Sequence, residues 1–124
     1  MNGFIGDIEK ETLENSNFRK VIYTGKHAQL VVMSLAPGEE IGLEVHPEVD
    51  QFFRIEKGSA KVVIDGDEQV VGQDFVIVVP AGSEHNVINV SQEEELKLYT
   101  IYSPPNHPDG TIHKTKVEAD AAEH

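Results

Sequence analysis

The 124-residue chain is predicted to be an all-β protein, either an antiparallel sandwich or a barrel. Short apolar and β-branched segments recur between turns that contain Gly or Pro. No segment between residues 20 and 102 keeps a helical period of apolar residues. The pair Asp65-Gly66, which separates two such segments, is a strong signal for a β-hairpin. Together these observations favour many short strands joined by tight turns.

The chain begins with a polar, acidic stretch over residues 1–18, which is expected to include a short helix. Strands are then predicted at residues 21–23, 28–35, 41–46, 51–56, 61–64, 69–71, 75–79, 84–90 and 96–102. Residues 75–79 are continuously apolar and are predicted to form a buried strand. We expect a polar N-terminal arm over residues 1–20, the barrel over 21–103, and a C-terminal loop and tail over 104–124.

The tail is predicted to be irregular until about Lys114, because it opens with Pro104-Pro105. The last ten residues are expected to form a weak helix or to be disordered, and His124 is expected to be disordered.

Composition indicates one soluble domain, with 39% hydrophobic and 26% charged residues. The absence of cysteine excludes disulfides, thiolate metal sites and thiol nucleophiles, so nitrogen and oxygen atoms must hold any metal. The net charge of −12 argues against nucleic acid and anionic membranes as partners. No apolar run reaches membrane-spanning length, and no basic, apolar leader is seen, so a cytoplasmic location is expected.

Two segments, residues 38–58 and 72–89, place polar side chains inside otherwise apolar strands. Because alternate residues of a strand share a face, Gln51 shares a face with Phe53 and His85 shares one with Val87. If the apolar side chains point into the barrel, these polar ones do too, and a metal ion is the best way to satisfy them. The candidate ligands are Glu44, His46, Gln51 and His85.

These segments resemble the two sequence motifs of the cupin superfamily, and the resemblance covers roughly residues 28–102. The second motif is matched by Pro80, Gly82, His85 and Asn89, although Gly72 lies two residues further upstream than the usual opening glycine. The first motif is matched by Gly38, His46 and Gly58. It departs from the family at two ligand positions, where Glu44 replaces the usual histidine and Gln51 replaces the usual glutamate.

The resemblance implies a double-stranded β-helix, also called a jelly-roll barrel, and commonly a homodimer. Leu43, Val45 and Phe52, on the outer faces, are compatible with a dimer interface. Two imidazoles with oxygen ligands suit a divalent transition metal such as Zn, Fe, Mn, Ni, Co or Cu.

Two alternatives to this ligand set remain open. In one, Glu44 pairs with a protonated histidine and no metal is bound. In the other, His46 and Glu48 take the first two ligand positions, which places Pro47 inside the pair.

The resemblance to small sugar-acid-converting cupins and to mannose-6-phosphate isomerase implies a metal-dependent isomerase or lyase acting on a small polar substrate such as a sugar or sugar acid. Glu44 or a tyrosine would move the proton. Tyr99 and Tyr102 lie on opposite faces of the last strand, so at most one faces the cavity, and Tyr99 is one candidate. A dioxygenase using Fe, Ni or Cu and a non-catalytic binding protein are the alternatives.

Five further polar residues lie outside the candidate ligand set. His107 and His113 lie in a Pro-rich loop that either folds back over the barrel mouth or is exposed. Gln29 either reaches the cavity or lies at an edge. Arg54 is expected outside the barrel, and Asn89 is expected to be structural, as in cupins.

Overall fold

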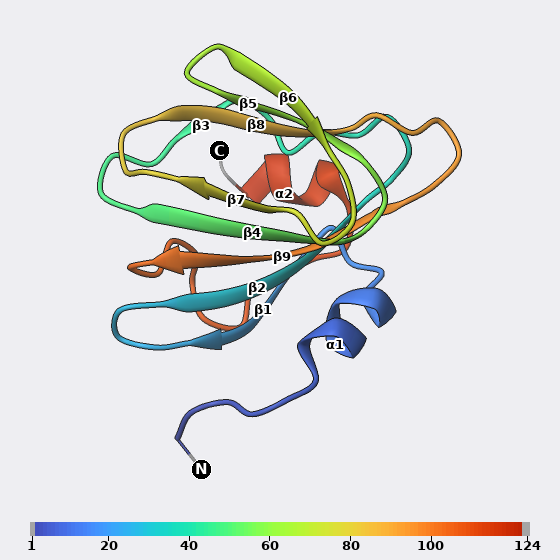
Figure 1. The fold of residues 1–124 in the computed structure, drawn as a ribbon. Coiled ribbons are helices and arrows are strands. Elements are labelled where there is room, and N and C mark those ends of the chain that lie inside the picture. Colours follow the sequence, from blue (N-terminus) through green and yellow to red (C-terminus); the bar gives the residue numbers. More distant parts are fainter. Residues whose placement is uncertain (1, 123–124) are drawn as a thin grey trace.

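Two antiparallel sheets face each other in the computed structural model, which describes residues 2–122 (Figure 1). The larger sheet has the strand order β10-β1-β2-β9-β4-β7. Its strands are β1 (Arg19–Thr24), β2 (Gln29–Leu35), β4 (Asp50–Lys57), β7 (Val76–Val79), β9 (Leu96–Ser103) and β10 (Ile112–His113). The smaller sheet, in the order β3-β8-β5-β6, contains β3 (Glu44–Val45), β5 (Ala60–Ile64), β6 (Asp67–Val71) and β8 (Glu84–Asn89). This arrangement confirms the predicted jelly-roll.

The core fills the space between the two sheets. Alternate residues of each strand point inward, and the register brings Met33 of β2 beside Leu98 of β9, which in turn lies beside Ile55 of β4. All three side chains are completely buried. The same alternation carries polar side chains inward near one end of the barrel, where the candidate ligands lie.

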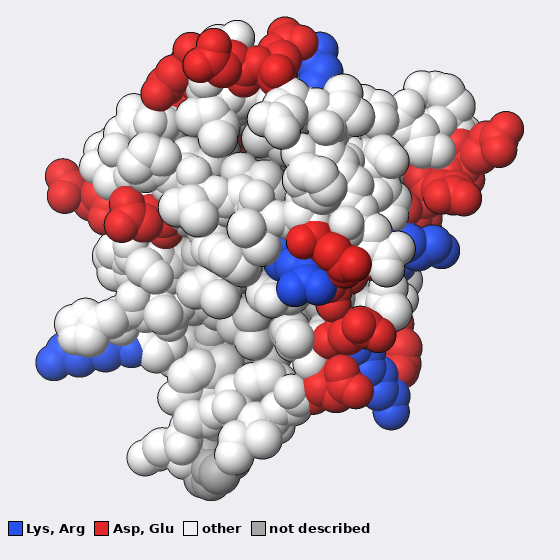
Figure 2. Space-filling view, in the orientation of Figure 1, with Lys and Arg blue, Asp and Glu red and all other residues white. Residues whose placement is uncertain are grey.

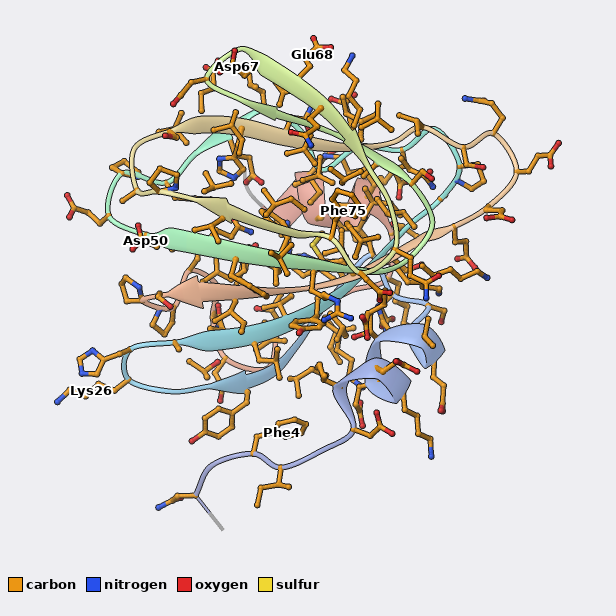
Figure 3. The ribbon with its side chains drawn as sticks, in the orientation of Figure 1. Phe4, Lys26, Asp50, Asp67, Glu68 and Phe75 are labelled. Atoms are coloured by element: carbon orange, nitrogen blue, oxygen red, sulfur yellow. The ribbon has the colours of Figure 1, made fainter. Side chains whose placement is uncertain are left out.

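The hairpin predicted at Asp65-Gly66 joins β5 to β6. Both residues have positive φ values, 49° for Asp65 and 87° for Gly66, as a two-residue type I′ turn requires. Figure 3 shows Asp67 and Glu68 at the tip of this hairpin, away from the rest of the barrel.

The prediction of a buried strand at residues 75–79 is wrong. The strand β7 exists, but it lies at the edge of the larger sheet, and Phe75, Val76 and Val78 are 49%, 53% and 62% exposed. Only Ile77 and Val79 are buried. The continuous apolar run therefore correctly predicted a strand, but only one face of that strand is buried in the core.

The strand predicted at residues 41–46 is reduced to β3. Gly42 has a φ of +109°, which is a left-handed conformation, and its N–H donates to the side chain of Asn86 at 2.9 Å. This irregular backbone interrupts the strand just before Glu44. Leu43 and Val45, on the far side from the barrel interior, are 61% and 47% exposed. The homodimer that would cover such residues stays a prediction.

The two ends of the chain pack on different parts of the barrel. The predicted N-terminal helix is α1 (Ile8–Glu14), which Asp7 caps by accepting a hydrogen bond from the N–H of Lys10 at 3.1 Å. It packs on the outer face of β2, β4 and β9 (Figure 1). Phe4, on the preceding arm, lies away from the barrel (Figure 3).

The C-terminal region contains the helix that was one of the two expectations for the last ten residues, and a short strand that was not predicted. After an irregular loop, β10 pairs with β1, and α2 (Lys116–Ala122) follows. Ala119 of α2 is buried in the core, and Lys116 donates from Nζ to the carbonyl of Ile41 at 2.9 Å. His124 lies outside the described residues. No described helix is both long and apolar enough to cross a membrane.

Candidate metal centre

Three side chains with metal-ligating atoms meet inside the barrel. The strands β3 and β8 pair so that Glu44 lies opposite His85, and His46 directly follows β3. One ligand atom from each of Glu44, His46 and His85 lies within 4.8 Å of the other two. Long-range pairing therefore brings together residues from both sequence motifs.

Gln51, the fourth candidate, enters the same place from the opposite sheet. It lies on the inner face of β4 and is 2% exposed. Its Nε2 donates to Thr100 Oγ1 at 3.0 Å, which turns its Oε1 toward His85 Nε2 at 3.1 Å. The hydrogen bond to Thr100 thus presents the amide oxygen to the three other ligands.

The hydrogen-bonding chemistry of His85 favours a cation here. Its Nδ1 lies 3.1 Å from the carbonyl of Ser83, which can only accept, so Nδ1 carries a proton. In a neutral imidazole Nε2 is then an acceptor, and it faces Oε1 of Gln51, which is also an acceptor. Neighbouring ligands of an octahedral ion with bonds of about 2.1 Å lie about 3 Å apart. The pair therefore fits two ligands of one metal.

The alternative in which Glu44 pairs with a protonated histidine stays open. Glu44 Oε2 and His46 Nε2 are 3.9 Å apart, which is within ion-pair range but longer than a hydrogen bond. One carboxylate, two imidazoles and an amide oxygen form a donor set suited to a divalent transition metal.

The turn before β8 explains why the second motif needs a glycine. Gly82 has a φ of +89° and donates its N–H to the carbonyl of His46 at 2.9 Å. The N–H of Ala81 donates to Asp50 Oδ1, also at 2.9 Å, and Figure 3 shows Asp50 at the start of β4. This turn ties the His46 backbone to the strand that carries His85.

Tyr102 is the tyrosine that the structure brings to the site. It is 2% exposed, and its ring lies edge-on to His46 with the centroids 5.9 Å apart. Its hydroxyl is 3.2 Å from His107 Nε2. Burial, followed by the positive charge of Arg19 and smaller contributions from His113 and His46, lowers the pKa of His107 to about 3. His107 is therefore neutral at physiological pH.

The structure does not bring Tyr99 together with the other candidates. Its ring stacks on Phe52 at 6.2 Å, on the outer face of the larger sheet. Strand alternation requires this, because Tyr102 points inward three residues later. Arg54 also lies outside, where it donates to Asp74 at 3.0 Å.

The loop after β9 is the part of the site that the sequence left open, and it does fold back onto the barrel. Gln29, 1% exposed on β2, accepts hydrogen bonds from the backbone N–H groups of Asn106 and His107 at 3.1 and 3.0 Å. Its Nε2 donates to the carbonyl of His107 at 2.7 Å. Gln29 thus holds the backbone of His107, whose imidazole contacts Tyr102. The strand register could have predicted that Gln29 lies opposite Tyr102. It could not have predicted a hydrogen bond to a loop residue 78 positions further along the chain.

Comparison with known proteins identifies the family. Residues 31–102 match the model of the cupin domain. The chain belongs to the cupin superfamily. This cupin is 51% identical to YrkC, an uncharacterized protein of Bacillus subtilis. The alignment covers 97% of this chain and 67% of YrkC. The crystal structure of BH2720 from Bacillus halodurans superposes with a TM-score of 0.93 at 45% identity, covering 95% of this chain and 93% of that one.

A weaker similarity links this cupin to a short part of a guanylyltransferase. Mannose-1-phosphate guanylyltransferase of Escherichia coli is 31% identical over 68 residues, which are 55% of this chain and 14% of that enzyme.

Proposed function

We propose that this cupin holds one divalent transition metal through Glu44, His46, Gln51 and His85. We propose further that it catalyses a proton transfer of the isomerase or lyase type on a small polar substrate such as a sugar or sugar acid. The observation that carries the proposal is the convergence of the Glu44, His46 and His85 ligand atoms within 4.8 Å, beside the buried hydroxyl-bearing ring of Tyr102.

The bound metal would supply Lewis-acid chemistry, by polarising a carbonyl or hydroxyl oxygen of the substrate. The protein residues would do the rest. Ser83 and Thr100 orient His85 and Gln51 through the hydrogen bonds described above. Tyr102 holds a proton at its phenolic oxygen, and neutral His107 accepts that hydrogen bond at Nε2 and so orients it. The loop fixed by Gln29 limits access of water to this pair.

Proton transfer is tested by exchange of carbon-bound hydrogen in D₂O, followed by NMR on a panel of aldoses, ketoses and sugar acids with metal-loaded protein. We expect exchange at the carbon beside the carbonyl of at least one substrate. Tyr102→Phe should lower its rate about 100- to 1000-fold while leaving metal content unchanged. Tyr99→Phe is the matched control and should change little. Exchange that survives in Tyr102→Phe would remove Tyr102 from the reaction.

A dioxygenase is the second candidate, because two histidines and one carboxylate also form the ligand set of non-haem Fe(II) oxygenases. Oxygen uptake by the Fe(II)-loaded protein, dependent on an organic substrate, would favour it over proton transfer. Tight ligand binding with neither exchange nor oxygen uptake would instead indicate a non-catalytic binding protein.

A further inference from the structure

The segment that leads to the candidate ligand Glu44 contains one extra residue. Glu40 lies opposite Ile88 of β8, and Glu44 lies opposite His85. Glu40 and Glu44 are four positions apart along the chain, whereas their partners are three positions apart. The segment therefore contains a β-bulge, in which two residues of one strand face one residue of the other. Gly42, with its φ of +109°, lies within this bulge.

The bulge decides which side chains face the metal centre. Because successive residues of a strand point to opposite faces, an uninterrupted pairing from Glu40 would place Leu43 opposite His85. Leu43 and Val45 would then point into the barrel, and Glu44 would point outward. This slipped pairing would cover two apolar side chains that are exposed in the observed pairing. Hydrophobic burial therefore favours the slip, so other contacts must hold the bulge in place.

Two side chains hold the backbone of the bulge. Asn86 of β8 accepts a hydrogen bond at Oδ1 from the N–H of Gly42 at 2.9 Å. Lys116, at the start of α2, donates from Nζ to the carbonyl of Ile41 at 2.9 Å. A Cβ added at Gly42 would lie 3.6 Å from the same Nζ, so the ammonium group lies against the bulge. A bulge takes backbone groups out of the strand ladder, and these two contacts satisfy one donor and one acceptor.

Lys116 is itself held in this position. Its Nζ also donates to Asp120 Oδ1, one turn later on α2, at 2.6 Å, and it lies 5.7 Å from the centroid of the Phe18 ring. Ala119, on the same helix, is buried in the core and anchors α2. Most of the basic side chains visible in Figure 2 lie on the surface beside acidic ones. Lys116 differs from them, because its ammonium group bonds a backbone carbonyl of the segment that leads to a candidate ligand.

We propose that Lys116 is a positioning residue for the metal centre: it holds the bulge that turns Glu44, and not Leu43, into the barrel. Its effect on metal binding rests on the proposed function, because it acts through a ligand of the same site. Lys116 takes no part in the chemical step. The C-terminal helix α2 is then needed for metal binding, although it supplies no candidate ligand.

Metal affinity, measured by competition with a chromophoric chelator, tests the proposal. Lys116→Met keeps most of the side-chain length but removes the donor, and it should weaken metal binding about 10- to 100-fold. Lys116→Arg should recover part of the loss, because a guanidinium also donates to a carbonyl. Lys114→Met is the matched control and should change nothing, since Lys114 is exposed. Unchanged affinity in folded Lys116→Met would overturn the proposal.

A second substitution separates positioning of the ligands from general support of the fold. If loss of the Lys116 donor lets the pairing slip, the side chain at position 43 points into the barrel. Leu43→Glu should therefore recover part of the lost affinity in Lys116→Met. It should change little in the wild type, where Leu43 is exposed. No recovery, in proteins that fold by circular dichroism, would show that Lys116 does not act through the register and would overturn the proposal.

Hydrogen exchange on chelator-treated protein tests the bulge without any metal. The amides of residues 42–46 should exchange about 10-fold faster in Lys116→Met than in the wild type, while those of the β5–β6 hairpin keep their rates. If the wild type holds no metal but this difference is seen, the proposed function fails and the hold of Lys116 on the bulge stands. If metal binds at the proposed ligands and neither affinity nor exchange depends on Lys116, this inference fails alone.

Discussion

Two buried polar residues near opposite ends of β8, on the same inner face, show how a structural side chain differs from a candidate ligand. Asn89 donates from Nδ2 to the carbonyls of Leu35, Ala36 and Glu94, at 2.9 to 3.1 Å, and its Oδ1 accepts from the N–H of Ser91. Donors meet acceptors throughout, so Asn89 ties two turns to the strand and requires nothing more.

His85, at the other end, is equally buried, but its contacts are not matched in this way. Its Nδ1 donates to Ser83, whereas its Nε2 faces the Oε1 acceptor of Gln51, with Glu44 and His46 close by. Burial alone therefore does not mark a functional residue. The convergence of acceptors, which a cation would satisfy, distinguishes the His85 end from the Asn89 end.

Replacing a metal ligand should have the largest effect. It should remove the metal from the His85 end of β8 and leave the hydrogen bonds of Asn89 intact. His85→Ala or His46→Ala is expected to reduce bound metal from about one equivalent to almost none while the fold survives, because the barrel core does not depend on either imidazole. Metal analysis with circular dichroism measures both properties. Full metal content in either variant would show that the ligand assignment is wrong.

Asn89→Ala should produce the opposite pattern. Removing its amide leaves buried carbonyls without a donor, so the free energy of unfolding should fall by about 3 kcal/mol. Urea denaturation measures this loss, and metal content is expected to stay at the wild-type level. Loss of metal with unchanged stability would show that Asn89 supports the metal and not the fold, which would contradict its structural role.

Thr100→Val sharpens the comparison by leaving all four ligands in place. Without the Oγ1 acceptor, Gln51 is no longer held with its oxygen toward His85, and metal affinity should weaken about 10- to 100-fold. Competition with a chromophoric chelator measures the affinity. Ser34→Ala, which removes a hydrogen bond to Glu95 far from the ligands, is the control and should have no effect.

The last prediction concerns pH and does not involve the metal. His107 has a pKa of about 3 in the folded protein, below its ordinary value near 6.5, so the unfolded chain binds a proton first as the pH falls. The stability of chelator-treated protein should therefore decrease from pH 6.5 toward pH 3, and less steeply in His107→Asn. Equal slopes for the two proteins in urea denaturation would contradict a neutral, buried His107.

Much of the fold could be predicted because turns are local. The turn at Asp65-Gly66 depends only on the backbone conformation of these two residues. The second motif, from Pro80 to Asn89, can be recognised from residue types and spacings within ten positions of sequence. Phe75–Val79 was misjudged because the pattern of an apolar run does not reveal whether a neighbouring strand or sheet covers its outer face.

The site was only partly predictable for the same reason. Strand alternation correctly placed Gln51 and His85 on buried faces, yet it could not choose between Tyr99 and Tyr102. The clamp of Gln29 on His107 and the pairing of Arg19 with His113 join residues 78 and 94 positions apart. Arg19 also lay within the stretch interpreted as a polar arm, although β1 begins at that residue.

The central claim is that the acceptors gathered around His85 hold one metal ion. The most direct test is metal content by plasma mass spectrometry, on untagged protein purified without chelator. We predict about one equivalent of a transition metal in the wild type and almost none in His85→Ala. No metal in the wild type, even after reconstitution with Zn, Fe, Mn, Ni, Co or Cu, would contradict the account.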